Sequence, residues 1–422
     1  MADTGTQKRI VWTLAACTAL ALFGDTTLYA VLPAEYGLLA ISAAQVGWLL
    51  SVNRLVRIPL NLMSGWLADR LGCRAPYIIG IAVGALSTAA YGLLRGFWPL
   101  LISRALWGLA WSLLTVAAYG LILDTSPSDN RGRNTSIYDS YSYFGGSVGM
   151  LLGGFLVDWL KLPRAMLVLS LFSATGVVMA LTLPRVPSPS GRPDRAPRER
   201  LSLRTALRAT WQGMVGADLR FWVIAALNFA HRFFFAGVFY STFGFYLRQV
   251  TGDEAHLGAW VIGVASLTSL LLFARNVTTI ITSPALGHLS DRLGDRGHVL
   301  ILGEVLGVAG LAAFAGSTSP ALIGAGVLLA AVAYGVVPPM LVAWLGDLTS
   351  AGSRGRHVGG YQTAGDLGSG LGPLVAYALL PMMGIQWVYG LSAAFLALTV
   401  PLILWARARA PRKGKALASE PA

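Results

Sequence analysis

The chain contains the stretch Gly65-Trp66-Leu67-Ala68-Asp69-Arg70-Leu71-Gly72-Cys73-Arg74 and, 222 positions later, the stretch Gly287-His288-Leu289-Ser290-Asp291-Arg292-Leu293-Gly294-Asp295-Arg296. Seven of the ten positions carry the same residue in both stretches. Each stretch follows one long apolar segment and precedes another. A copy placed alike in the two halves of a chain indicates an internal repeat. Repeated halves in a polytopic membrane protein are typical of secondary transporters.

The composition also indicates a membrane protein. The 422 residues are 55% hydrophobic and 12% charged, and the mean hydropathy is +0.62. Soluble domains carry about 25% charged residues, so half the usual charge is missing. The net charge of +13 comes from Lys and Arg between apolar runs and at the ends, which is typical of membrane topology signals and argues against nucleic-acid binding. Cys17 and Cys73 lie too far apart to imply a disulfide or a metal site.

A membrane-spanning helix needs about 20 apolar residues, and twelve segments meet this requirement. They are residues 10–33, 45–67, 75–94, 98–122, 134–158, 164–183, 220–247, 257–284, 298–316, 320–346, 357–382 and 385–406. The sequence therefore predicts an all-α membrane protein with twelve transmembrane helices in two pseudo-symmetric six-helix bundles. We expect an N-terminal bundle at 1–183, a linker at 184–219, a C-terminal bundle at 220–406 and a tail at 407–422.

Basic residues predict the orientation of these spans. The linker is rich in Pro and Arg, and its part from Leu201 to Trp211 could form a basic amphipathic helix on the membrane surface. Basic residues also gather near the N-terminus, in both repeated stretches and in the tail, all on one side of the predicted spans. The positive-inside rule then places both termini in the cytoplasm, in a plasma membrane such as the inner membrane of a bacterium.

Two further aspartates extend the repeat. Asp124 lies nine residues before Arg133, and Asp347 lies nine residues before Arg356. With these matches the chain resembles the major facilitator superfamily over essentially its whole length, in particular the twelve-helix drug/proton antiporters. The repeated stretches resemble that family's loop between helices 2 and 3 and its echo between helices 8 and 9. The resemblance implies two six-helix bundles around a central cavity that opens alternately to each side.

The resemblance also implies a cytoplasmic gate. In the family, the matching Asp and Arg hold the two halves together on that side, with an acidic partner at the end of helix 4. The residues expected to form the gate and its weaker echo are Gly65, Asp69, Arg70, Gly72, Arg74, Asp124, Asp291, Arg292 and Asp347. The alternative is ordinary loop charge with no conformational role, because exposed ion pairs contribute only about 0–1 kcal/mol.

Ionisable residues within the predicted spans are the candidate functional residues. Each costs at least ~2.5–3.5 kcal/mol at mid-helix, so each needs a partner or a water-filled cavity. Arg104 resembles the helix 4 arginine motif of proton-coupled members, whereas Met150 stands where drug antiporters usually have Pro. The candidates for proton coupling are Asp25, Asp139, Asp366 and Arg104. The candidates for the substrate cavity are Arg54, Arg57, Asn53, Trp107, Trp111, Tyr138, Asn228, His231, Arg232, Arg275 and Asn276.

Two interpretations of these residues remain open. In the first, a carboxylate carries a proton and the arginines bind an anionic group. In the second, Asp–Arg pairs only neutralise each other inside each bundle. Arginines outnumber aspartates in the spans, which favours a substrate with a negative group or a neutral amphiphile. Glu304 also needs a partner, which the sequence does not identify.

The sequence favours a secondary active transporter over an enzyme. We find no hydrolase, paired metal-ligand or phosphate-loop motif. The leading prediction is proton-coupled efflux of a small amphipathic or organic solute by a monomer that needs no cofactor and no metal. The alternatives are proton-coupled uptake of an organic anion and the flipping of a lipid or glycolipid.

Overall fold

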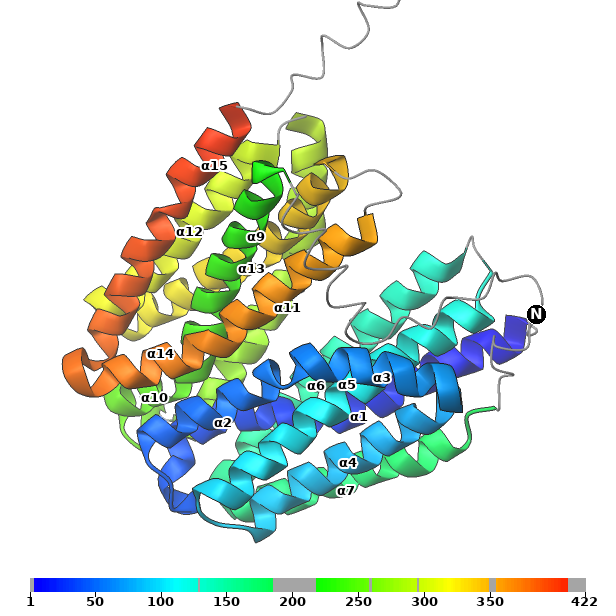
Figure 1. Cartoon of the computed structure of the whole chain (residues 1–422). Helices are drawn as coiled ribbons and strands as arrows, with labels where there is room; N and C mark the ends of the chain where they lie inside the picture. The colour runs from blue at the N-terminus through cyan, green and yellow to red at the C-terminus, as the bar shows by residue number, and fades with distance from the viewer. Residues whose placement is uncertain are drawn as a thin grey trace, which may run out of the picture.

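The computed structural model describes residues 4–127, 130–184, 218–257, 260–293, 296–348 and 354–408. The amphipathic helix predicted between Leu201 and Trp211 lies outside these residues, as does most of the predicted tail. The described chain is almost entirely helical and forms two bundles, as predicted (Figure 1). The all-α fold with its two bundles is confirmed.

The described residues of the N-terminal bundle form seven α-helices and one short 3₁₀ helix. They are α1 (Thr4–Glu35), η1 (Tyr36–Leu39), α2 (Ala43–Leu55), α3 (Arg57–Leu71), α4 (Arg74–Leu93), α5 (Phe97–Thr125), α6 (Arg131–Leu160) and α7 (Leu162–Leu181). The C-terminal bundle begins with α9 (Leu219–Arg232), the π-helical segment η4 (Phe233–Phe239) and α10 (Tyr240–Thr251). It continues with α11 (Val264–Leu293), α12 (Arg296–Gly316), α13 (Pro320–Leu348), α14 (Arg354–Ala397) and α15 (Thr399–Ala408).

Ten described segments are long and apolar enough to cross a membrane. They correspond to the twelve predicted spans because one segment holds two spans and because the second predicted span is divided into two shorter helices. The last of the ten segments, His357–Ala408, holds two spans that are separated at Gly384. Gly384 has φ 78°, a backbone conformation that favours glycine and interrupts the helix. The second predicted span is divided into α2 and α3, which have only 13 and 15 residues.

The division between α2 and α3 has a local cause. Pro59 is the third residue of α3. Proline has no backbone N–H, so the carbonyl of Leu55, four residues earlier, receives no helical hydrogen bond. The helix therefore ends at Leu55 and restarts at Arg57. This break lies between Arg54 and Arg57, two of the candidates for the substrate cavity.

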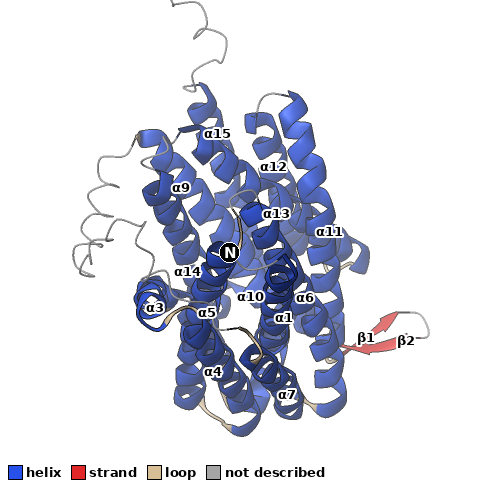
Figure 2. Ribbon diagram, turned by 90° about the vertical axis from the view of Figure 1, so that its right-hand side faces the viewer, coloured by secondary structure: helices blue, strands red, loops and turns tan. Residues whose placement is uncertain are grey.

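The prediction for the eighth span was wrong at its start. The expected helix over 257–284 begins only at Val264, and a hairpin precedes it. Strand β1 (Glu254–Leu257) pairs antiparallel with β2 (Trp260–Gly263). The apolar run Trp260-Val261-Ile262 resembles a helix in hydropathy, but its aromatic and β-branched residues suit a strand. The hairpin projects from the side of the bundles (Figure 2).

The two bundles meet at one end and diverge toward the other (Figure 1). We call the first the joined end, where η1 and the connection between α6 and α7 lie. We call the other the open end, where α1 begins and α15 ends. One hydrophobic core includes Leu50 of α2 and Tyr377 of α14, so it joins the bundles. Two further cores each belong to a single bundle.

Polar contacts also connect the bundles toward the joined end. Asp158 of α6 accepts a hydrogen bond from the backbone N–H of Ser266 at 2.8 Å, in the first turn of α11. Arg248 of α10 donates to the carbonyl of Ala34 in α1 and pairs with Glu35 at 3.5 Å. These contacts stabilise the arrangement in which this end is closed.

Candidate functional site

A buried ion pair lies in the N-terminal bundle. Arg104 of α5 donates to Oδ1 of Asp25 on α1, and the two side chains are only 2% and 8% exposed. Asp25 lies ten residues before the end of α1, or roughly 15 Å along the helix from the joined end. Asn53 of α2 also donates to Asp25 Oδ1 at 3.4 Å. The structure thus contains an Asp–Arg pair inside one bundle, which is the arrangement of the second interpretation; the sequence did not identify Arg104 as the partner of Asp25.

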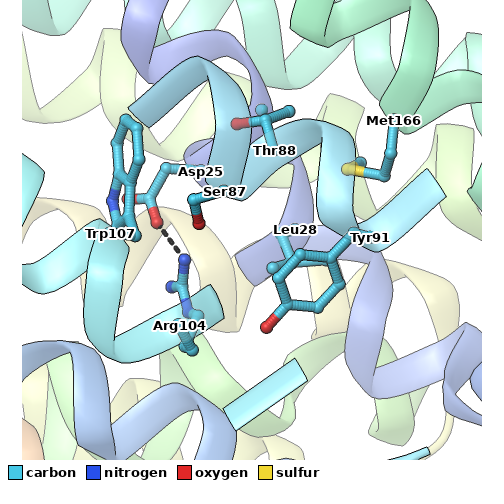
Figure 3. Close-up of a pocket in the computed structure, with 9 residues that line it drawn as sticks. Asp25, Leu28, Ser87, Thr88, Tyr91, Arg104, Trp107 and Met166 are labelled. Carbon is cyan, nitrogen blue, oxygen red and sulfur yellow. Dashed lines mark hydrogen bonds and ion pairs between the residues drawn. The ribbon is translucent and has the colours of Figure 1, made fainter. Parts of the chain in front are cut away.

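Figure 3 shows this ion pair at the edge of a small cavity. The cavity is lined by Gly24, Asp25, Leu28, Ser87, Thr88, Tyr91, Arg104, Trp107 and Met166. Within the described chain, the Nε and Nη2 atoms of Arg104 have no hydrogen-bond partner. A guanidinium has five N–H donors, so Arg104 retains donors for a water molecule in the cavity.

A chain of polar contacts extends from the ion pair along the second span. Asn53 donates to the hydroxyl of Tyr29 at 3.3 Å, and its own Oδ1 accepts from Arg57 Nη2 at 2.7 Å. Arg54 donates to the same Tyr29 hydroxyl through Nε at 3.2 Å. The guanidinium of Arg57 lies 5.2 Å from the ring centroid of Trp111 on α5. These predicted residues thus form one connected group with Asp25 and Arg104.

Tyr29 is not among the predicted site residues, although it accepts hydrogen bonds from both Asn53 and Arg54 in this group. The guanidinium of Arg104 lies 4.7 Å from the centroid of its ring, and that of Arg54 lies 5.3 Å away. Tyr29 follows Asp25 by four residues, a spacing that places two side chains on the same face of a helix. That spacing was the signal available in the sequence.

The group continues into the C-terminal bundle through aromatic rings. The ring centroids of Tyr29 and Tyr240 lie 5.6 Å apart. Arg275 of α11 lies 5.8 Å from the centroid of Tyr240 and 4.3 Å from that of Tyr334 on α13. Asn276 donates to Ser147 of α6 at 2.9 Å, which is a further polar link between the bundles. We call the connected residues the central cluster; they are Asp25, Tyr29, Asn53, Arg54, Arg57, Arg104, Trp111, Tyr240, Arg275, Asn276 and Tyr334.

Other predicted cavity residues lie inside a single bundle. Trp107 and Tyr138 are fully buried in the N-terminal core. Tyr138 shares a hydrogen bond of 3.2 Å with Thr18. In the C-terminal bundle, Asn228 donates to the carbonyl of Tyr361 at 2.7 Å. Trp107, Tyr138 and Asn228 therefore lie where packing residues are expected.

The other two candidate aspartates have different surroundings. Asp139 of α6 is half-buried and accepts a hydrogen bond from Tyr119 at 2.8 Å. Asp366 of α14 is half-buried and lies within electrostatic range of Arg54 and Arg57. Asp366 therefore faces the central cluster, whereas Asp139 bonds within its own bundle.

His231 and Glu304 form a second buried pair. His231 of α9 lies with Nδ1 3.5 Å from Oε1 of Glu304 on α12, and both side chains are completely buried. Glu304, for which the sequence offered no partner, thus has one. Arg232, the next residue on α9, is half-buried, and its Nε has no hydrogen-bond partner within the described chain.

The predicted gate residues lie at the open end, and three of their neighbourhoods in the described chain have contacts within one bundle. Arg74 donates to the carbonyl oxygens of Leu183 and Leu181 at 2.7 and 2.8 Å. Arg296 pairs with Asp347. The guanidinium of Arg70 lies 4.0 Å from the Trp66 ring centroid. A latch between the bundles remains a prediction for the conformation in which this end closes.

The turn between α3 and α4 has the features that the gate sequence predicts. Gly72 has φ 75°, which explains the glycine at this position. Burial raises the pKa of the neighbouring Cys73 thiol to about 11, and the Asp124 and Asp69 carboxylates add to the shift. Asp69 and Asp124, the two acidic gate residues of this half, therefore both lie near Cys73 in this turn. Arg292 of the second copy is exposed, and the side chain of Asp291 lies outside the described residues.

Comparisons with known proteins agree with this architecture. The family model described as Major Facilitator Superfamily matches residues 14–275 and 265–422. The quinolone resistance protein NorA of Staphylococcus aureus is 26% identical over 139 residues, which are 33% of this chain and only 36% of the NorA chain. The vesicular acetylcholine transporter unc-17 of Caenorhabditis elegans is 29% identical over 127 residues, 30% of this chain and 24% of that one.

Solved structures show the same fold at low sequence identity. The nucleoside transporter NupG superposes with a TM-score of 0.74 at 16% identity, over 95% of this chain and 99% of that one. The human organic anion transporter MFSD10 superposes with a TM-score of 0.65 at 21% identity, over 94% and 99% of the two chains.

Proposed function

The chain belongs to the Major Facilitator Superfamily and is a membrane transporter, and we propose that it exports a small amphipathic organic solute in exchange for protons. The observation that carries this proposal is the buried Asp25–Arg104 pair within the central cluster. Asp25 is the acid in the central cluster, and it accepts hydrogen bonds from Arg104 and Asn53. A change in its charge therefore acts on every arginine bonded to it directly or through Asn53 and Tyr29.

Exchange requires the solute and the proton to compete for one site. A solute with a basic amine would displace the proton from Asp25, while its apolar part lies on the rings of Tyr29, Trp111, Tyr240 and Tyr334. Aromatic faces near cations favour flat, polarisable ligands. The similarity to a quinolone resistance protein supports a substrate of this class.

The charges of the cluster favour a second candidate, uptake of an organic anion together with protons. Protonation of Asp25 would leave Arg104 uncompensated and would add to the positive charge of Arg54, Arg57 and Arg275. An anion would then bind more tightly when the proton is bound, and reciprocal linkage makes both move together.

We further propose that the open end faces the cytoplasm, so that both termini lie on that side of the plasma membrane. The basic residues of the two repeated stretches support this orientation, because cytoplasmic loops carry an excess of Lys and Arg. The same orientation makes the described conformation open to the inside.

Proteoliposomes that hold the full chain and a fluorescent quinolone test both candidates. A quinolone is a suitable probe because it carries a carboxylate and a basic amine on an aromatic system. Exchange predicts accumulation in vesicles with an acidic lumen, and symport predicts accumulation in vesicles with an alkaline lumen. Liposomes without protein correct for passive redistribution.

The variant Asp25→Asn is the decisive comparison. It cannot change its charge, so it should lose accumulation against the gradient while retaining downhill flux. Accumulation by Asp25→Asn equal to that of the wild type, under either gradient, would show that Asp25 does not couple transport to protons.

A further inference from the structure

We propose that His231 and Glu304 form a proton-binding site inside the C-terminal bundle, separate from Asp25 and Arg104. The inference deepens the proposed function, since it adds a second proton to the transport cycle. Its test needs no substrate and no flux, so it can fail or succeed independently of transport.

The two side chains are isolated from other polar groups. His231 lies in the last turn of α9 and Glu304 near the middle of α12. Both are 0% exposed, with Nδ1 and Oε1 3.5 Å apart. Within the described chain, neither carboxylate oxygen and neither imidazole nitrogen has a hydrogen-bond partner at normal distance. A buried pair with this many unused polar atoms needs a chemical explanation.

The walls around the pair are apolar or aromatic. The imidazole ring lies 4.8 Å from the Phe235 ring and 5.8 Å from the Tyr334 ring, centroid to centroid. Gly303 and Gly307 on α12 leave room for Val337 and Phe235 to pack beside Glu304. These apolar surroundings solvate a carboxylate poorly, so an unpaired charge on Glu304 would have a high free energy.

Charged and titratable groups lie one layer further out. The residues that face this region from the packed elements are Arg232 on α9, Arg275 on α11, Tyr334 on α13, and Tyr361 and Asp366 on α14. Arg275 lies over the Tyr334 ring, and Arg232 and Arg54 lie within electrostatic range of the Tyr334 hydroxyl. The pair is thus connected through Tyr334 to the central cluster.

One proton makes the pair electrically neutral. It resides on Glu304, whose O–H then donates to the neutral imidazole of His231. Loss of that proton to water changes the charge of the pair from zero to minus one, and no other bond changes. The negatively charged, deprotonated pair is stabilised only when water enters the site or the nearby arginines approach it.

The local backbone suits such a change. The π-helical segment η4 begins two residues after His231 and contains Phe235, whose ring packs on the imidazole. Single π-turns inside α-helices occur frequently at functional sites. Gly237 of η4 packs directly on Gly372 of α14, so a shift of α14 bears on the π-helical segment that directly follows α9 and His231.

Infrared difference spectroscopy of the full chain in lipid vesicles tests the site as the pH is raised. The wild type should show the C=O stretch of a buried carboxylic acid that is lost at alkaline pH. Glu304→Gln should lack this band, and Asp25→Asn should keep it. His231→Gln should lose the acid band at lower pH, by about one pH unit or more, because the protonated carboxyl has lost the imidazole that accepts its hydrogen bond.

Two results would overturn the proposal. One is a wild-type spectrum in which no carboxylic acid band titrates, or in which the titrating band persists in Glu304→Gln. The other, which serves if Glu304→Gln does not fold, is an identical titration midpoint in the wild type and His231→Gln. A failure of quinolone transport in vesicles would count against the proposed function and would leave this readout unaffected.

Discussion

Asp25 and Arg104 hold opposite charges together in the interior of the N-terminal bundle, where a single charge is expensive. The pair is bonded to Asn53 and stacked on Tyr29, so both members have several contacts. Breaking a buried pair by removing one partner is costly because the remaining charge is uncompensated. Removing both charges together avoids that cost.

A double-mutant cycle tests this description of the pair. Arg104→Gln should lose about 3–5 kcal/mol of stability, as expected when a buried carboxylate loses its partner. The double variant Asp25→Asn/Arg104→Gln should recover most of the loss. Thermal unfolding in detergent, followed by tryptophan fluorescence, measures the effect. Equal unfolding temperatures for the single and double variants would mean that Asp25 is not charged in the folded protein.

Single residues also show where sequence-based prediction reaches its limit. Asp25 and Arg104 could be identified because ionisable residues in a membrane span require partners. The partner of Glu304 could not, because His231 comes from a distant helix and only packing brings the two together. Trp107 shares a helix face with Arg104, yet it lies in the core of one bundle and not between the bundles. Hydropathy cannot say which face of a buried helix meets which neighbour.

Individual elements explain how the bundles are held at the joined end. Asp158, near the end of α6, accepts from the backbone N–H of Ser266 at the start of α11. The first N–H groups of a helix lack intrahelical partners, and the helix dipole favours a negative charge there. Asp158 thus caps a helix of the opposite bundle and stabilises closure of that end.

Removal of this cap should shift the conformational equilibrium. Asp158→Ala should favour the state open at the joined end by about 1 kcal/mol, or roughly fivefold in population. Asp158→Asn keeps an acceptor oxygen and should shift it less. Spin labels at Leu38 and Met382, which are 43% and 78% exposed, report the distance across this end. An unchanged distance distribution in Asp158→Ala would show that the cap does not contribute to closure.

Element boundaries were only partly predictable. The break after Leu55 has a signal in Pro59, but a proline inside an apolar run is also compatible with a kinked continuous helix. The hairpin before α11 was missed because hydropathy alone does not distinguish a short apolar strand from the start of a helix.

The whole molecule follows from the duplicated sequence. Two repeated stretches predicted two halves, and the described helices form two bundles (Figure 1). Which end is closed could not be predicted, because one sequence must support both conformations and they differ by only a few kcal/mol. The structure shows one of them, with a core shared at the joined end and separate cores toward the open end.

We propose that protonation of Asp25 drives alternating access, and paired distance measurements across the two ends of the molecule test this proposal. In a background without Cys17 and Cys73, one pair of spin labels at Leu38 and Met382 reports on the joined end. A second pair at Leu181 and Leu404, which are 55% and 48% exposed, reports on the open end. Electron–electron double resonance then gives both distances at acidic and alkaline pH and in Asp25→Asn. We predict opposite changes at the two ends, with Asp25→Asn fixed in the acidic distribution at every pH. Distances that do not respond to pH, or that lengthen at both ends together, would contradict the account.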